Sequence, residues 1–234
     1  MNDYGQYAHV VFDWNGTVID DFDLAVRSVN RVRTAVGLEE IDHSTYRRLF
    51  RFPIVEFYRD IGFDFRATPF DVLVARYLLH FDAEVGDCAL CDGFHELVEI
   101  LRAAGSRLAI LSASHQQTLM RTAERLQVAE KIDHIYGLDD TAASGKIARA
   151  RELDRRLERK PDARVLLIGD TDHDYAVAVD RNWDFIAVAS GHQSRLRLTS
   201  LGVPVFDRLS DLAAHFCAAQ PQSTTRPAGG TVLA

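Results

Sequence analysis

Four short motifs carry side chains that could do chemistry, and each follows an apolar run or opens a helical pattern. The side chains are Asp13 in VVFDWNGT, Ser112 in AILSAS, Lys146 in SGK, and Asp170 and Asp174 in LLIGDTDHD. Each alone has an ordinary structural interpretation, such as a turn residue or a helix cap. Together they fit one reaction, because carboxylates bind Mg²⁺ while a hydroxyl and an ammonium bind a phosphate. Such a cation screens the repulsion between two anions, so that a carboxylate can attack phosphorus.

The elements that must position these motifs alternate along the chain between buried strands and amphipathic helices. Apolar runs typical of strands covered on both faces lie at 8–13, 107–114, 134–138, 164–170, 184–190 and 203–207. Helical patterns include 93–105 and 144–160. This alternation predicts an α/β protein with a Rossmann-like parallel sheet and helices on both faces. Ligands bind at the carboxyl ends of such strands, where Asp13, Ser112 and Asp170 stand.

The interval from about Asp21 to Val85 contains no convincing strand and several helical patterns. We therefore expect an α-helical cap, residues 21–86, inserted after the first strand of a catalytic core made of 1–20 and 87–215. The remaining segment, 216–234, is rich in Pro, Gly, Ser and Thr, and we expect it to be disordered.

Composition limits the class of protein. The chain has 234 residues, of which 47% are hydrophobic and 26% charged, as is typical of a folded globular protein. A net charge of -7 and a pI near 5.7 argue against a nucleic-acid binder. No apolar run is long enough to span a membrane, and the first residues lack the features of a secretion signal. Cys88 and Cys91 form a lone CxxC without further zinc ligands at metal spacing, and we expect a reducing, cytoplasmic location.

The motifs resemble those of the haloacid dehalogenase superfamily, specifically its phosphatases with a helical cap inserted after the first motif. FDWNGTVID is similar to the first family motif, ILSAS to the second, SGK to the third and IGDTDHD to the fourth, and the resemblance extends to about residue 215. DWNGT, together with SGHQS at 190–194, is most similar to a phosphoglycolate-phosphatase-like subgroup. The resemblance implies an Mg²⁺-dependent phosphatase that acts on a small phosphorylated metabolite.

The resemblance also implies roles for individual residues. Asp13 would be the nucleophile that forms an aspartyl-phosphate, and Thr17 would steady its loop. The ligands of Mg²⁺ would be Asp13, the backbone carbonyl of Asn15, Asp170 and, directly or through water, Asp174. The groups that bind the phosphoryl group would be Ser112, Ala113 and Lys146. The cap would close over the substrate and exclude water.

Asn15 departs from the family pattern, which has a second aspartate two positions after the nucleophile. That aspartate protonates the leaving oxygen and then activates water, whereas an amide cannot exchange a proton at neutral pH. General acid–base catalysis contributes about 10²–10⁴-fold, so its loss weakens an enzyme without necessarily abolishing turnover.

Asn15 has four interpretations. The proton could come from elsewhere, namely from a cap residue, His115, His173 or the substrate. The substrate could carry a good leaving group, as an acyl phosphate does. The protein could resemble phosphonoacetaldehyde hydrolase, which uses a Schiff-base lysine from its cap, although residues 21–86 contain no lysine. It could also bind a phosphorylated ligand without turnover. Retention of both Asp13 and GDTDHD favours the first interpretation.

Three further residues are candidates for contact with the rest of the substrate. Arg51 and Phe52 precede Pro53 at an expected helix break in YRRLFRFP, where an arginine could bind a second anionic group such as a carboxylate. A solvated helix face is the alternative for the arginines of this segment. His192 lies in SGHQS, directly after a strand and on the ligand side of the expected sheet. A polar loop packed against the cap is the equal alternative for this segment.

Overall fold

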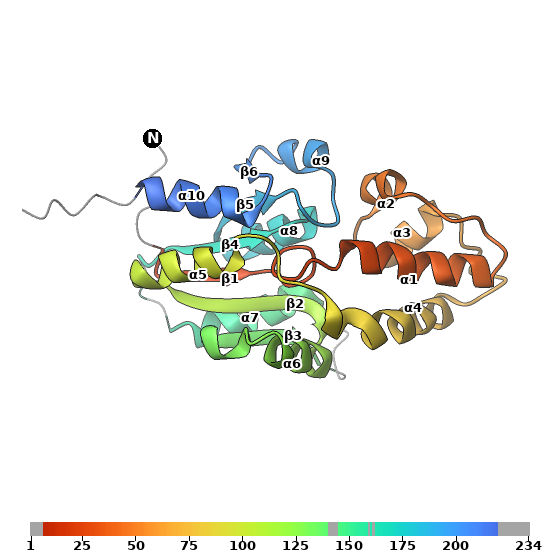
Figure 1. The fold of residues 1–234 in the computed structure, drawn as a ribbon, viewed down its shortest axis with the longest axis horizontal. Helices are drawn as coiled ribbons and strands as arrows, with labels where there is room; N and C mark the ends of the chain where they lie inside the picture. Colours follow the sequence, from red (N-terminus) through yellow and green to blue (C-terminus); the bar gives the residue numbers. More distant parts are fainter. Residues whose placement is uncertain (1–6, 140–144, 159, 161, 220–234) are drawn as a thin grey trace, which may run out of the picture.

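A six-stranded parallel sheet forms the centre of the computed structural model, which describes residues 7–139, 145–158, 160 and 162–219 (Figure 1). The strand order is β3-β2-β1-β4-β5-β6. The strands are β1 (His9–Phe12), β2 (Arg107–His115), β3 (His134–Leu138), β4 (Val165–Gly169), β5 (Asp184–Val188) and β6 (Val205–Phe206). Every pairing between neighbours is parallel, so the predicted Rossmann-like α/β core is confirmed.

The position of β1 in the middle of the sheet brings the motifs together. β1 lies between β2 and β4, with Phe12 opposite Ile110 on one side and Ile168 on the other. Asp13 follows directly, and its backbone N–H donates to Ile168 O at 2.8 Å. Asp170 stands two residues after Ile168, at the end of the neighbouring strand. The carboxyl ends of β1 and β4 therefore present Asp13 and Asp170 at the same edge of the sheet.

Alternating side chains of β1 divide the core into two layers, because successive residues of a strand point to opposite faces. Val10 and Phe12 pack in the first layer and Val11 in the second. The core helices that bury residues in the first layer are α5 (Phe94–Ala103), α6 (Gln116–Arg125) and α10 (Leu209–Ala219). Those of the second layer are α7 (Lys146–Arg156), α8 (Asp172–Arg181) and α9 (Arg195–Thr199). Helices thus cover both faces of the sheet, as predicted (Figure 1).

Further helices lie together beyond the sheet, on the right in Figure 1, and come between β1 and β2 in the sequence. They are α1 (Phe22–Ala35), α2 (His43–Leu49), α3 (Ile54–Asp60) and α4 (Phe70–Glu84). Two short 3-10 helices follow in the chain, η1 (Val85–Asp87) after α4 and η2 (Ala129–Lys131) before β3. α1 packs along α4, with Val32 and Leu73 fully buried. A helical cap after the first strand is therefore present, while its boundaries at residues 21 and 86 stay a prediction.

The predicted disordered segment, 216–234, begins within a helix of the structure. Helix α10 continues to Ala219, because its apolar residues recur at helical spacing and Phe216 is buried in the first layer. The remainder, 220–234, lies outside the described residues. Within the described part of the chain, no helix combines the length and the apolar character that a membrane span requires.

Candidate active site

Three carboxylates and one ammonium meet at the carboxyl edge of the sheet. Oxygen atoms of Asp13, Asp170 and Asp174 all lie within 4.8 Å of one another, and all three residues are buried. Lys146, the first residue of α7, is buried as well, and its Nζ donates to Asp13 Oδ1 and, at 2.5 Å, to Asp174 Oδ1. Four predicted site residues from three distant motifs thus form one cluster.

The charges of this cluster do not balance. Burial, reinforced by the neighbouring Asp174, raises the pKa of Asp13 well above its usual value. Burial also raises the pKa of Asp170 to about 6, and Asp174 adds to the shift. For Lys146, the two bonded carboxylates outweigh the effect of burial and raise the pKa, so the amine stays charged. One ammonium therefore faces three carboxylates, and a further cation would be needed to hold all three ionised.

The donor set fits Mg²⁺. The three aspartates offer oxygen atoms, which a hard cation prefers, and these atoms are close enough together for one ion to touch more than one carboxylate. Their raised pKa values show that the protein alone does not stabilise the ionised forms of Asp13 and Asp170.

The loop after β1 wraps around Asp170. Thr17 is fully buried, and its hydroxyl donates to Asp170 Oδ1 at 3.3 Å. Gly16 has a φ of 73°, and a Cβ atom there would lie 2.5 Å from Asp170 Oδ2. Only glycine tolerates both this backbone conformation and this close approach. From the loop after β5, the backbone N–H of His192 donates to the same Oδ2 at 2.6 Å. These contacts fix the orientation of the Asp170 carboxylate.

Asn15 is held at both ends of its side-chain amide. Its Nδ2 donates to Asp21 Oδ2 at 2.8 Å. Its Oδ1 accepts from Ser114 Oγ at 2.7 Å and from Ser112 Oγ at 3.5 Å. An aspartate in this place would lose the donor and would bring two carboxylates together. The surroundings of Asn15 therefore suit an amide.

Asp21 is a residue of the site that the sequence analysis missed. It occupies the N-cap of α1, yet its side chain makes no hydrogen bond to that helix and accepts instead from the backbone N–H of Gly16 at 2.7 Å. Its Oδ1 lies 3.4 Å from Nε2 of the buried His192, whose Nδ1 is 3.2 Å from the Tyr46 hydroxyl. Burial disfavours a charged imidazole, but the nearby carboxylates, Asp21 foremost, raise the pKa of His192 to about 9. An acid at the start of a helix is common, so its residue type alone gave no signal.

A cavity of about 460 Å³ lies between this cluster and the cap. The predicted site residues that border it are Asp13, Asn15, Phe52, Ala113, Lys146, Asp170, Asp174 and His192. The cap residues that border it are mostly apolar, namely Val29, Tyr46, Phe50, Phe52, Ile54, Phe57, Tyr58, Phe70, Val74, Tyr77, Leu78 and Phe81. A concave, largely apolar space with a few convergent polar groups is the usual form of a small-molecule site.

Two predicted binding residues do not border the cavity. Ser112 is fully buried, and its Oγ accepts from the backbone N–H of Ser114 at 2.9 Å. Ser114 borders the cavity, whereas Ser112 does not. Arg51 turns to α3, where it pairs with Asp60 at 2.7 Å and with Glu56 at 3.7 Å. Both carboxylates belong to α3, so the guanidinium of Arg51 forms its ion pairs within the cap. The structure therefore does not bring Arg51 to the cavity.

Phe52 borders the cavity by stacking on His173, with ring centroids 4.3 Å apart and planes inclined by 21°. Burial, assisted by the charge of Lys146, lowers the pKa of His173. The imidazole is therefore neutral at neutral pH and suits the role of a proton acceptor better than that of a proton donor.

Arg47, on the same segment as Arg51, ties the cap to the core. Its Nε donates to Gly191 O at 3.0 Å and its Nη2 to Ser190 O at 2.9 Å. Its guanidinium also lies 3.9 Å from the centre of the Phe22 ring. Gln193, in the loop after β5, and Arg197, in α9, each donate to Phe50 O at 3.2 Å. The cap is thus held against the loop that follows β5.

The lone CxxC contributes nothing to this site. Cys88 and Cys91 are free thiols, and burial raises the pKa of Cys88 to about 11 and that of Cys91 further. Within the described residues, the group that could hold a metal ion consists of the three aspartates and includes neither thiol.

The sequence is similar to a family of known hydrolases and to a known phosphatase. A family model described as haloacid dehalogenase-like hydrolase matches residues 10–188. A phosphoglycolate phosphatase from Synechococcus elongatus is 24% identical over 197 residues, which are 82% of this chain and 88% of that protein.

Two solved structures illustrate the similarity of fold. A predicted phosphatase from Clostridium acetobutylicum has a TM-score of 0.77 at 22% identity, over 91% of this chain and 99% of that one. CbbY from Rhodobacter sphaeroides, solved in complex with phosphate, has a TM-score of 0.69 at 20% identity, over 88% and 96% of the two chains.

Proposed function

Because the chain belongs to the haloacid dehalogenase-like hydrolase family, we propose that it is a phosphatase that moves the phosphoryl group of a small phosphorylated metabolite to Asp13 and then to water, with Mg²⁺ as cofactor. The observation that carries the proposal is the buried cluster of Asp13, Asp170, Asp174 and Lys146 at the end of the cavity. Carboxylates are seldom fully buried unless a cation compensates them.

The residues that would hold Mg²⁺ are Asp13, Asp170 and the backbone carbonyl of Asn15, with Asp174 in support directly or through water. When bound, the ion neutralises negative charge on the phosphate and so allows a carboxylate to approach it.

In the first step, an ionised oxygen of Asp13 forms a bond to phosphorus while the bond between phosphorus and the ester oxygen breaks. Lys146 donates to Asp13 Oδ1, which favours the ionised carboxylate, and its ammonium is placed to bind an incoming phosphate oxygen. The ester oxygen leaves and takes up a proton from solvent to become an alcohol. In the second step, water attacks phosphorus, the bond to Asp13 breaks, and inorganic phosphate leaves while the water proton passes to solvent.

Asn15 makes both steps depend on proton transfer from another source, because an amide neither gives nor takes a proton at neutral pH. Its hydrogen bonds to Asp21 and Ser114 hold it as a fixed polar group beside Asp13. We therefore expect slower turnover of substrates with poor leaving groups, and slow release of phosphate from Asp13.

Asn15 also supports a second candidate, a protein that binds a phosphorylated ligand without turnover. Retention of Asp13 in contact with Lys146 favours the enzyme, because binding alone does not need a nucleophile. Hydrolysis of a carbon–phosphorus bond through a Schiff base has no support. Among the described residues that border the cavity, Lys146 is the one lysine, and it comes from α7 and not from the cap.

The test is release of inorganic phosphate from a panel of phosphate esters and acyl phosphates, in Mg²⁺ and in EDTA, by the wild type, Asp13→Asn and Asp20→Asn. Asp20 is an exposed acid of the same motif and serves as the matched control. We expect Mg²⁺-dependent release by the wild type and Asp20→Asn, and none by Asp13→Asn. Absence of turnover by the wild type across the panel would favour the binding protein.

A further inference from the structure

We propose that this site selects phosphate monoesters whose leaving group is uncharged and apolar, about the size of a benzyl group, over esters that carry a second anion. The inference rests on the proposed phosphatase function and concerns the part of the substrate that faces the cap.

The wall that the cap presents to the substrate is aromatic. Tyr46, Phe50 and Phe57 form a group whose ring centroids lie 5.1–5.2 Å apart. Two more pairs line the same cavity, Tyr58 with Phe70 at 5.5 Å and Tyr77 with Phe81 at 5.4 Å. Aromatic rings favour a further ring that stacks or meets them edge to face.

Part of this wall is exposed to solvent, and covering it with an apolar group would favour binding. Phe52, Phe70, Val74 and Tyr77 are only half-buried, and Leu78 is 44% exposed although it borders the cavity. An apolar group that fills the space between them removes their surface from water and is bound more tightly for that reason. A small charged group would leave the same apolar surface exposed to water.

A second anion on the substrate would find no free cation here. Among the described residues that border the cavity, Lys146 is the one lysine or arginine, and it already contacts Asp13 and Asp174. Residues 140–144, outside the described part, contain no lysine or arginine. His192 faces Asp21 at 3.4 Å, and a further acid, Asp82, borders the cavity. Among the described residues that border the cavity, a carboxylate would therefore meet the acids Asp21 and Asp82 and no unpaired lysine or arginine.

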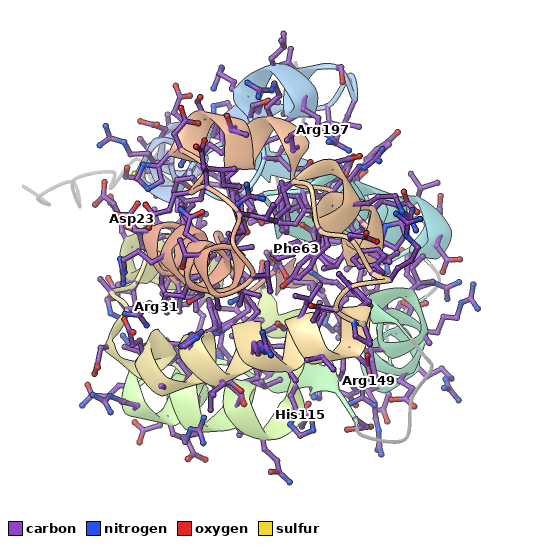
Figure 2. All side chains as sticks on the ribbon, turned by 90° about the vertical axis from the view of Figure 1, so that its right-hand side faces the viewer. Asp23, Arg31, Phe63, His115, Arg149 and Arg197 are labelled. Atoms are coloured by element: carbon purple, nitrogen blue, oxygen red, sulfur yellow. The ribbon has the colours of Figure 1, made fainter. Side chains whose placement is uncertain are left out.

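Three arginines on this side of the molecule form ion pairs outside the cavity. Seen from the cap side (Figure 2), Phe63 lies near the middle of the molecule, while Arg31 and Arg149 lie toward its edge. Arg31 pairs with Glu84 at 2.5 Å, and Arg149 with Asp139 at 2.8 Å. Arg51 pairs with Asp60 at 2.7 Å. These pairs leave the arginines away from the substrate space.

The relative from Synechococcus elongatus is named for phosphoglycolate, a substrate that carries a carboxylate next to its phosphate ester. The aromatic wall of the present cavity does not suit such a carboxylate. The same cavity would accept benzyl phosphate, whose ester oxygen is also that of a primary alcohol. The two esters differ little in chemistry at phosphorus, so they compare the fit of the leaving groups directly.

The first experiment measures kcat/KM for two matched pairs of substrates with Mg²⁺. Benzyl phosphate is compared with phosphoglycolate, and phenyl phosphate with 4-carboxyphenyl phosphate. We expect the apolar member of each pair to be preferred by about tenfold or more, the effect of burying one such side chain. The carboxyl group does not make the phenolate a poorer leaving group, so a preference within the second pair reports binding.

The second experiment changes the wall. Leu78→Arg places a cation at the cavity, and Leu79→Arg, on the next residue of α4 and 72% exposed away from it, is the matched control. We expect Leu78→Arg to lower kcat/KM for benzyl phosphate and to raise it for phosphoglycolate, so that the ratio falls about tenfold or more. Leu79→Arg should leave the ratio unchanged.

A third measurement separates this inference from the proposed function. Calorimetry compares two non-hydrolysable analogues, 2-phenylethylphosphonate and 3-phosphonopropionate, in Mg²⁺. Preference for 2-phenylethylphosphonate without turnover of any ester would overturn the phosphatase and support the apolar site. Preference for 3-phosphonopropionate, or for phosphoglycolate in turnover, would overturn the inference while the phosphatase stands.

Discussion

The side-chain amide of Asn15 donates to Asp21 Oδ2 at 2.8 Å, and so joins the loop after β1 to the first residue of the expected cap. Asp21 accepts this bond in place of capping its own helix. The position that carries an acid in the family pattern is thereby occupied by a group held between an acceptor, Asp21, and a donor, Ser114. Asn15 therefore offers no carboxyl proton at this position and is part of a fixed hydrogen-bond network.

Replacing Asn15 with aspartate should raise the rate for substrates with poor leaving groups. Repulsion from Asp21 would raise the pKa of the new carboxyl group, so that it could supply a proton near neutral pH. We expect kcat for benzyl phosphate to rise about tenfold or more in Asn15→Asp, within the range of acid–base catalysis. 4-Nitrophenyl phosphate, whose leaving group needs no proton, should change little.

The control for this prediction is Asn15→Ala, which removes the amide without adding an acid. It should gain nothing with either substrate. An equal gain in Asn15→Ala and Asn15→Asp would show that the network, and not the missing acid, limits the rate.

Removal of the metal should destabilise the protein more as the pH rises. Without a cation, Asp170 has a folded-state pKa of about 6 against an ordinary value of 3.8. A raised pKa stabilises the fold below pH 3.8, and this stabilisation, about 3 kcal/mol, is lost as the pH rises through 6. Mg²⁺ would restore it by holding the carboxylates ionised. Melting in EDTA and in Mg²⁺ should therefore differ little at pH 5 and by roughly 5–10 °C at pH 7.5.

Two variants check the source of that difference. Asp170→Asn should abolish the Mg²⁺-dependent shift in Tm at pH 7.5, whereas Asp211→Asn, at an exposed acid of α10, should retain it. A shift of equal size at pH 5 and pH 7.5 would contradict the assignment to raised carboxyl pKa values.

Arg47 should control how well the cap closes. Arg47→Ala removes two hydrogen bonds to the loop at Ser190 and Gly191 and the contact with the Phe22 ring. We expect KM for benzyl phosphate to rise about tenfold to a hundredfold, because each of these three contacts contributes on the order of 1 kcal/mol. Arg48→Ala is the matched control, since exposed Arg48 bonds only within its own helix, to Thr45, in the hydrogen bonds described. Equal effects of the two variants would contradict the role of Arg47.

Lys146 should be needed for stability as well as for binding phosphate. Lys146→Met leaves Asp13 and Asp174 buried without their ammonium, and breaking a buried ion pair from one side costs about 3–5 kcal/mol. Chemical denaturation at pH 7.5 should show a loss of that order, smaller at pH 5, because the raised pKa of Asp13 lets its carboxyl group take up a proton as the pH falls. Lys160→Met, at an exposed lysine, should show none. A loss that does not depend on pH would point to packing and not to charge.

The convergence of Asp13, Asp170 and Lys146 could be predicted from the sequence because it follows from topology. Near-continuous apolar runs identify strands covered on both faces, such strands pair in parallel, and their carboxyl ends share an edge. Side chains that follow these runs must then meet, whatever the details of the loops. The helical character of the insertion was equally readable, because no apolar run of strand type interrupts it.

The contacts made by the cap could not be predicted in this way. Arg47 and Arg51 stand four residues apart, as neighbours on one helix face would, but α2 ends at Leu49 and the chain turns before Arg51. Arg47 therefore reaches the core, while Arg51 meets Asp60. The role of Asp21 was hidden for a similar reason, since it depends on a rotation of the side chain away from its own helix. Both outcomes depend on tertiary packing, which residue type and spacing do not predict.

The central claim is that Asp13 receives the phosphoryl group, and the most direct test is mass spectrometry of protein quenched in acid during turnover of 4-nitrophenyl phosphate with Mg²⁺. The leaving group of this ester departs readily, and Asn15 does not activate water, so the second step should be slow. We predict that a large fraction of the wild-type protein carries one phosphoryl group on the peptide that contains Asp13, less of it in Asn15→Asp, and none in Asp13→Asn. Release of phosphate by the wild type with no phosphoryl group at Asp13, or turnover by Asp13→Asn, would contradict the account.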